Sequence, residues 1–403
     1  MENSPNNTLR LIVIGIVCCL LTGIAYGFGM YLFPMVMPEM LAELNLSYTD
    51  AGIVTGFGQA APLLILPFIS RLTQRIGALR LIVSSQIIGA TLLLSLSFIQ
   101  GYYSLMLLIF LLRGWPMLVW IPLISVVTNH FDLSWRATVL TTASATACFF
   151  VFINGLLSSF FLEYFDWRTL WQVVASICLI TGIGCWLSLK VVNAWHEQGD
   201  NQGKKKGSVS TILRWCKTRS GINLLLLFGV TGFSFVPFQM YLAPYLRDNM
   251  GLGLETSALI WSVMGISGMI GGMVMGRVTD RFGVKTSYLL VFTMATISAI
   301  MVSLPISSAQ LITMAILFGV AQATIFGLGP AYIAKVLPPE SAAMALSSAT
   351  TVMVLASLMG NFLGGWSGGQ FNSFWFLYVF LGVLFLLGAL VSCGLKSEKS
   401  THS

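Results

Sequence analysis

An internal repeat constrains the fold of this chain more than any other feature of its sequence. Residues 30–34 read MYLFP and residues 240–244 read MYLAP, an offset of 210 residues. Residues 70–77 (SRLTQRIG) return at 276–283 as GRVTDRFG, an offset of 206 residues. Two echoes at nearly the same spacing indicate two homologous halves. We therefore expect the two halves to build similar sets of elements.

The composition indicates that both halves lie in a membrane. Hydrophobic residues make up 56% of the chain, charged residues only 9%, and the mean hydropathy is +0.86. Soluble domains carry roughly 25% charged residues, so this chain cannot hide its apolar surface in its own core. Long continuous apolar runs, without the alternation of barrel strands, exclude a transmembrane β-barrel.

A bilayer core of about 30 Å needs roughly 20 apolar residues per helix, and the sequence offers twelve such runs. The predicted fold is an all-α integral membrane protein, with 12 transmembrane helices arranged as two pseudo-symmetric six-helix bundles. We expect helices at 9–37, 49–70, 78–99, 104–128, 138–162, 169–192, 221–246, 256–276, 285–305, 309–334, 341–368 and 374–394.

Charge and polarity predict the domains and the topology. We place a six-helix bundle at 1–192, a polar linker at 193–219 and a second bundle at 220–403. Basic residues gather on one side of the predicted spans, which predicts a multi-pass protein of the cytoplasmic (inner) membrane with both termini in the cytoplasm. The lysine run at 204–206 is either part of this topology signal or a contact with anionic lipid.

Residues 276–285 (GRVTDRFGVK), interpreted as a loop, resemble a marker of the major facilitator superfamily. That family carries Gly-x3-Asp-Arg-x-Gly-x-Lys/Arg between the second and third helices of each half. Residues 166–168 (DWR) are similar to another common family feature. The resemblance implies secondary transport by alternating access. Tyr26, Phe28, Gly29 and Pro34 are, in addition, faintly similar to the monocarboxylate and oxalate/formate exchangers of the family.

The resemblance also implies a charge clamp that gates access from the cytoplasm. Gln74 stands at the place of the acid in the first-half copy, so the clamp there should be weaker. The alternative is that the first-half arginines only satisfy the positive-inside rule. The residues that we assign to the gate are Asp280, Arg277, Arg281, Gly276, Gly283, Arg71 and Arg75.

Arg113 is the strongest candidate for a substrate-binding residue. It lies about nine residues into the predicted fourth helix, hence roughly 14 Å deep, where a charge costs on the order of 2.5–3.5 kcal/mol and usually marks a pathway. The family often has an arginine near this point, although followed by Gln-Gly and not by Gly114-Trp115. Arg113 binds substrate or couples transport, or it is a structural arginine held by helix carbonyls.

No Asp or Glu lies inside a predicted helix away from its ends. An anionic substrate would supply a counter-charge to Arg113 in a bidentate contact, which favours a carboxylate. Other polar groups at mid-depth are cavity candidates, although an interhelical hydrogen bond is the alternative for each. These candidates are Tyr26, Tyr31, Asn154, Gln239, Tyr241, Gln322 and Asn361.

The predicted function is secondary active transport of a small organic solute, an organic anion, by symport or exchange. Its expected partners are H+ or a counter-transported anion and the lipid bilayer, with no nucleic acid, no cofactor, no metal and no second copy of the chain. The alternative is multidrug or metabolite efflux by proton antiport. A membrane enzyme is excluded because His130, His196 and His402 all fall in loops or the tail, away from membrane depth.

Overall fold

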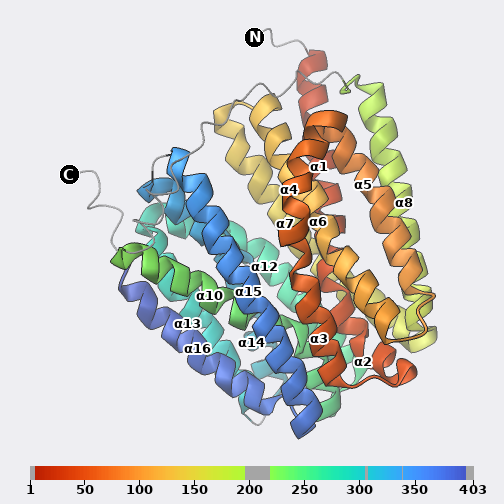
Figure 1. Cartoon of the computed structure of the whole chain (residues 1–403), viewed down its shortest axis with the longest axis vertical. Helices are drawn as coiled ribbons and strands as arrows, with labels where there is room; N and C mark the ends of the chain where they lie inside the picture. Colours follow the sequence, from red (N-terminus) through yellow and green to blue (C-terminus); the bar gives the residue numbers. More distant parts are fainter. Residues whose placement is uncertain (1–4, 196–217, 305–306, 338, 396–403) are drawn as a thin grey trace. The chain divides into compact units, whose positions relative to one another are not determined.

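The computed structural model describes residues 5–195, 218–304, 307–337 and 339–395 (Figure 1). Every regular element in these ranges is a helix. Twelve helical spans are long and apolar enough to cross a membrane, which confirms the predicted number. Most of the predicted linker, 196–217, and the last residues, 396–403, lie outside the described part of the chain.

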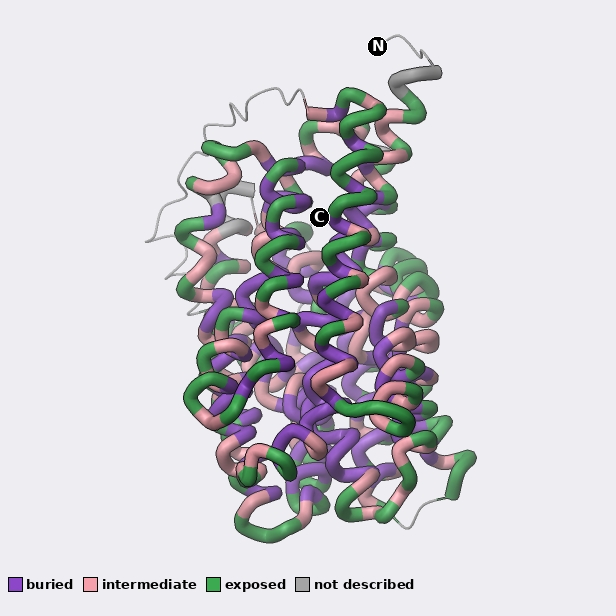
Figure 2. Tube along the Cα trace, turned by 90° about the vertical axis from the view of Figure 1, so that its right-hand side faces the viewer, coloured by how far each residue is buried: buried purple, intermediate pink, exposed green. Residues whose placement is uncertain are grey.

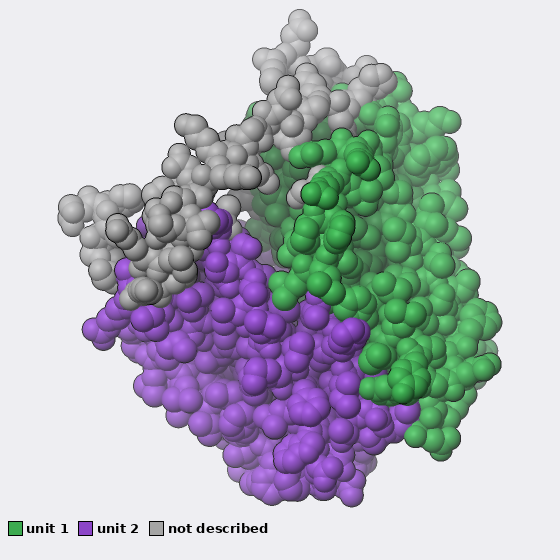
Figure 3. Space-filling view, in the orientation of Figure 1, with its two compact units in different colours: residues 1–45, 61–202 green, residues 46–60, 203–403 purple. Residues whose placement is uncertain are grey.

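The chain divides into two compact units, residues 1–45 with 61–202 and residues 46–60 with 203–403 (Figure 3). The proposed bundle boundaries, 1–192 and 220–403, differ from these units mainly at residues 46–60. The domain boundaries therefore stay a prediction.

The first unit is built of helices that pack side by side. In it, α1 packs against α7, and α5 packs against both α6 and α8. Its elements are α1 (Pro5–Tyr26), the π-helical turn η1 (Gly27–Tyr31), α2 (Phe33–Leu44), α4 (Ala61–Ile76), α5 (Ala78–Leu96), α6 (Tyr102–His130), α7 (Leu133–Tyr164) and α8 (Trp167–Val191).

The second unit pairs α12 with α14, α10 with α15 and α13 with α16. Its elements are α3 (Tyr48–Gln59), α10 (Arg219–Met240), α11 (Leu242–Pro244), the π-helical turn η2 (Tyr245–Asn249), α12 (Leu254–Phe282), α13 (Val284–Ser303), α14 (Ser308–Val336), α15 (Pro339–Phe371) and α16 (Trp375–Cys393).

Helix α3 belongs to the second unit because glycines let it lie against α15 (Figure 1). A Cβ atom on Gly52 would lie 2.8 Å from the Cα of Gly365, and a Cβ on Gly365 would lie 2.4 Å from the Cα of Gly52. Both values are too short for any side chain, so backbone packs on backbone here. The predicted helix 49–70 is accordingly two helices, α3 and α4, separated at Ala60.

The predicted first helix at 9–37 lies within one candidate membrane span, Thr8–Leu44, but it is not a regular α-helix throughout. The structure interrupts it with the π-helical turn η1 and continues it as α2 to Leu44. Pro34 lies in the first turn of α2, where its missing N–H costs nothing. The repeated sequence has the same effect in the second half, where α10 ends at Met240 and the short α11 ends at Pro244. The MYxxP echo thus marks a broken helix in both halves.

The second echo marks two one-residue turns of matching geometry. Gly77 has φ +93° and Gly283 has φ +90°, a region that favours glycine. The N–H of each glycine donates to a threonine carbonyl four residues earlier, Thr73 or Thr279, at 2.9 Å in both copies. The prediction of a loop at 276–285 is wrong, because α12 continues to Phe282 and only Gly283 separates it from α13.

Exposed positions follow one side of individual helices, and buried positions follow the other (Figure 2). The exposed sides are apolar, as Leu179, Ile183 and Trp186 on α8 illustrate. Large exposed apolar side chains in spans of this length face acyl chains.

Candidate functional site

Arg113 lies in the middle part of α6 and is only 3% exposed. Among the described cations, it alone lies more than ten residues from both ends of its helix. A charge at such a depth is costly and usually faces a cavity or a polar network. Arg113 is thus buried in the middle part of its helix, and its role in binding stays a prediction.

The residues after Arg113 fix which side of α6 it occupies. A Cβ on Gly114 would meet Ile65 of α4, and the ring of Trp115 fills the space beside Gly89 of α5 and Gly29 of η1. Gly114 and Trp115 therefore face neighbouring helices of the first unit. At 100° per residue, Arg113 lies on a third side of α6.

Trp120 shares this third side with Arg113, because seven residues are about two helical turns. The Trp120 ring meets the ring of Tyr26 edge to face, with centroids 6.0 Å apart and planes at 78°. The first unit thus places the Tyr26–Trp120 aromatic pair on the same side of α6 as the buried Arg113.

Asn154 of α7 supports the break in the first helix. Its side-chain Nδ2 donates to the carbonyl oxygen of Gly27 at 2.8 Å. Gly27 allows this approach, because a Cβ there would lie 2.2 Å from the Cβ of Phe150, one turn before Asn154. π-Helical turns occur often at functional sites, and this one begins directly after Tyr26 and ends at the half-buried Tyr31.

Two predicted amides of the second unit pair with each other. Nε2 of Gln322 on α14 donates to Oε1 of Gln239 on α10 at 2.9 Å. No described residue lies within hydrogen-bonding distance of Oε1 of Gln322. The aromatic rings of Phe238 and Phe318 stack beside this pair, with centroids 4.0 Å apart. The amide pair therefore keeps an acceptor available at the edge of an aromatic cluster.

Tyr241 and Asn361 also meet, but through the backbone. The Tyr241 hydroxyl donates to the carbonyl oxygen of Asn361 at 2.7 Å, and its ring stacks on Phe374. Both residues are fully buried. Within the described ranges, the side-chain amide of Asn361 has no hydrogen-bond partner. Tyr241 thus joins the end of α10 to α15. The side-chain amide of Asn361 is a buried polar group that needs a hydrogen-bond partner.

The residues assigned to the gate lie at the ends of α4 and α12. Arg71, Arg75, Arg277, Asp280 and Arg281 are all exposed. In the part of the chain that the structure describes, no carboxylate lies within 4.0 Å of Arg277 or Arg281, and the Arg281 guanidinium instead lies 5.4 Å from the centroid of the Phe282 ring. The clamp stays a prediction. Its turn residue, Gly283, has the positive φ angle that favours glycine.

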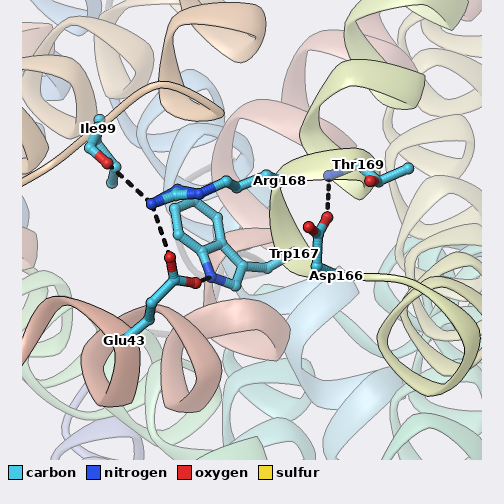
Figure 4. Close-up of polar contacts among 6 residues, drawn as sticks. All are labelled: Glu43, Ile99, Asp166, Trp167, Arg168 and Thr169. Carbon is cyan, nitrogen blue, oxygen red and sulfur yellow. Dashed lines mark hydrogen bonds and ion pairs between the residues drawn. The ribbon is translucent and has the colours of Figure 1, made fainter.

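The DWR segment forms a polar cluster whose partner the sequence did not reveal (Figure 4). The Glu43 carboxylate accepts a hydrogen bond from Nε1 of Trp167 at 2.5 Å and pairs with Nη2 of Arg168 at 2.8 Å. Arg168 also donates to the carbonyl oxygen of Ile99 at 3.3 Å. The cluster ties the ends of α2, α5 and α8 together. Trp167 and Glu43 are 124 residues apart, so no local pattern predicts their contact.

Asp166 caps helix α8 within the same cluster (Figure 4). Its Oδ1 accepts a hydrogen bond from the N–H of Thr169 at 2.6 Å. Hydrogen bonding to Thr169 stabilises the charged form and lowers the pKa of Asp166 below its ordinary value. Among the described residues, no group of three His, Cys, Asp or Glu side chains is arranged to hold a metal ion.

Twelve apolar spans, a duplicated half with a broken first helix in each copy, and a buried cation in the middle part of a helix together define a multi-pass membrane protein. The chain belongs to the major facilitator superfamily, whose model matches residues 19–308 and 269–403. The family is one of secondary transporters and not of enzymes. The match names no branch of the superfamily, so the likeness to carboxylate exchangers stays a prediction.

Relatives with partial similarity agree with this family. The chain is 25% identical to the MFS-type transporter opdF of Penicillium oxalicum over 41% of this chain and 39% of that protein. It is 25% identical to the uncharacterised MFS-type transporter YtbD of Bacillus subtilis over 64% and 61%. It is 27% identical to the probable multidrug resistance protein EmrY of Escherichia coli over 34% and 27%. The matched regions cover less than two thirds of these relatives.

Solved structures support the fold alone. A bacterial homologue of the human lysosomal transporter Spinster matches with a TM-score of 0.73 and 15% identity, over 98% of both chains. The nucleoside transporter NupG matches with a TM-score of 0.72 and 14% identity, over 95% of this chain and 98% of that one. These likenesses confirm the all-helical fold with twelve spans.

Proposed function

We propose that this transporter carries a small organic anion, a carboxylate, and that Arg113 binds the anionic group. The observation that carries the proposal is the position of Arg113, 3% exposed and far from both ends of α6. A guanidinium presents donors in a planar fork that fits a carboxylate in two parallel bonds. Such a group, held at mid-span, favours an anion over a cation or a neutral solute.

The neighbouring groups fit the remainder of such a substrate. Tyr26 and Trp120 would contact the apolar part beside the carboxylate, as their edge-to-face pair already lies on the Arg113 side of α6. Gln239 and Gln322, which pair with each other within the second unit, stay candidate polar contacts. Tyr31 and Asn361 are further contact candidates, whereas Asn154 and Tyr241 position the backbone to which they are bonded.

The placement of the carboxylates favours exchange over proton symport. Proton carriers in membrane proteins are usually acids buried inside a span. Every described Asp or Glu lies in a loop or within about one and a half turns of a helix end. We therefore propose a counter-transported anion as the coupled solute, with alternating access gated at Arg277, Asp280 and Arg281.

Counterflow in proteoliposomes tests the proposed substrate class. The purified protein is loaded with mono- and dicarboxylates, neutral analogues or organic cations, and the uptake of each labelled solute is measured. We expect exchange of carboxylates only, and its loss in Arg113→Ala. The matched control is Arg219→Gln, which removes an exposed cation at the start of α10 and should exchange normally. Transport of neutral or cationic solutes, unchanged in Arg113→Ala, would refute the proposal.

Efflux of drugs or metabolites is the second candidate. It is favoured by the partial likeness to a protein named as a probable multidrug resistance protein. Drug susceptibility of a deletion strain, with and without the wild-type chain, separates the two candidates. An unchanged drug spectrum together with carboxylate exchange supports the anion carrier, and a broadened spectrum supports efflux.

A further inference from the structure

We infer that the outer face of α5 and α8 binds one anionic phospholipid, with its phosphate held between Arg80 and Lys190. A groove of about 610 Å³ runs between these two helices of the first unit. Its size falls in the range of small-molecule sites, about 300–1,000 Å³. The groove lies apart from Arg113 and does not depend on the proposed substrate.

Each wall of the groove is a row of side chains on one helix, three or four residues apart in the sequence. On α5, Arg80, Ser84 and Ile87 share one exposed face. On α8, the row runs from Leu179 through Ile183 and Trp186 to Lys190 (Figure 1 shows the two helices). The row from residue 179 to residue 190 is about 16 Å long, close to the roughly 15 Å of one leaflet's hydrocarbon.

The floor of the groove offers no free polar group to an incoming solute. Gly182 lies so close to Gln86 that a Cβ there would be 2.9 Å from the Cβ of Gln86. The Gln86 side chain is 1% exposed, donates to the carbonyl oxygen of Ile82 and accepts from Sγ of Cys178. A satisfied, closed floor between aliphatic walls suits an acyl chain and not a soluble ion.

The mouth of the groove carries the charge. Arg80 stands in the first turn of α5 and Lys190 in the last turn of α8, so both lie at the same end of the antiparallel pair. Nζ of Lys190 lies 5.3 Å from the centroid of the Trp186 ring, which orients the ammonium over an aromatic face. Helices α5 and α8 contain no Asp or Glu, and no described carboxylate lies within 4.0 Å of either cation.

These features select an anionic lipid over other occupants. Arginine and lysine at the membrane surface attract phosphate headgroups, and basic pockets between helices bind acidic lipids. Trp186 and Trp195 both line the groove, and indole side chains favour the membrane interface. The predicted topology places this end of the helices on the cytoplasmic side. In the second half, Thr286 occupies the position equivalent to Arg80, three residues after the turn glycine.

Native mass spectrometry of the full chain with phosphatidylglycerol or phosphatidylcholine tests the inference. We expect one tightly retained phosphatidylglycerol per chain, preferred over phosphatidylcholine and not displaced by excess inorganic phosphate. Arg80→Gln with Lys190→Gln should weaken its binding about 25-fold, roughly fivefold per cation. Arg80→Lys should retain most of it, and Arg219→Gln should retain all.

Three outcomes would overturn the inference: equal retention of the two lipids, displacement by inorganic phosphate, or unchanged retention in the double variant. Helicity by circular dichroism and elution as a single species establish that each variant is folded. If the double variant does not fold, the single variants Arg80→Gln and Lys190→Gln carry the test. Each should then lose about fivefold in affinity for phosphatidylglycerol, and no loss in either refutes the site.

Discussion

Asn154 donates a hydrogen bond from Nδ2 to the carbonyl oxygen of Gly27 at 2.8 Å and so joins α7 to the π-helical turn that interrupts the first span. Inside a membrane, a backbone carbonyl released from regular helix bonding needs a partner from the protein. The amide of Asn154 supplies this partner to Gly27, the residue after Tyr26. The bond therefore holds the π-helical turn directly after Tyr26, whose ring packs against Trp120.

Asn154→Leu keeps the side-chain volume and removes this bond. Interhelical hydrogen bonds in membranes contribute about 0.6 kcal/mol on average and at most about 1.7 kcal/mol, so we expect destabilisation in this range, measured by unfolding in mixed micelles. The control is Ser158→Ala, one turn later on α7, because no described residue bonds the Ser158 hydroxyl. Equal stability of the two variants would show that the Gly27 bond contributes nothing.

A double-mutant cycle measures the coupling of Glu43 with Arg168. The two charged groups lie 2.8 Å apart, with side chains 50% and 29% exposed. Because solvent screens such pairs, we expect Glu43→Gln and Arg168→Gln to show a coupling free energy of about 0.2–1 kcal/mol. Trp167→Phe in the same background isolates the bond from the indole to Glu43. A coupling free energy of zero would mean that the pair is incidental to folding.

The cap of α8 should make stability depend on pH. The pKa of Asp166 is lowered in the folded protein by its bonds with Thr169, so its contribution is complete above the ordinary pKa of about 3.9. The contribution is lost as the pH falls through the lower, folded pKa. Asp166→Ala should cost about 0.5–2 kcal/mol at pH 7 and progressively less in acid.

Asp166→Asn is the matched variant for this test, because asparagine caps a helix without titrating. We expect the stability of the wild type, read from tryptophan fluorescence on heating, to fall relative to Asp166→Asn only below about pH 4. A constant difference between the two proteins across the acidic range would exclude a role for the charge.

The two turn glycines should be equally intolerant of a side chain. Gly77 and Gly283 have φ angles of +93° and +90°, and a non-glycine residue in a sparsely populated backbone region costs of order 1–3 kcal/mol. We expect similar losses of unfolding free energy for Gly77→Ala and Gly283→Ala. Gly184→Ala in α8 is the control, since nothing lies within 4 Å of the added Cβ, and it should be neutral or stabilising. Tolerance at one turn only would argue against equivalent copies.

Much of the architecture follows from the sequence because apolar runs and a repeat are local signals. The twelve spans and the family were predicted from these signals and are confirmed. The π-helical turn at 27–31 was missed, since hydropathy continues unbroken through it. The motif at 276–285 was placed in a loop because its charges ended the apolar run, whereas the helix continues until the positive φ of Gly283.

Tertiary partners were beyond the reach of sequence patterns. Asn154 and Gln322 were recognised as polar groups at mid-depth, but their partners, Gly27 and Gln239, lie 127 and 83 residues away. The groove between α5 and α8 likewise brings Arg80 and Lys190 together, although they are 110 residues apart in the sequence. The predicted topology treated basic residues only as charge on one side of the membrane. Such contacts depend on how glycine-lined faces bring particular helices together.

The most direct test of the central claim is a thermodynamic cycle between Arg113 and the charge of the ligand. Binding of the carboxylate that exchanges best, and of its neutral amide analogue, is measured by titration calorimetry with the wild type and with Arg113→Gln. A direct contact predicts that the two changes are coupled by about 1.5–3 kcal/mol, with Arg113→Lys falling in between. If the amide and the carboxylate lose affinity equally in Arg113→Gln, Arg113 does not bind the anionic group.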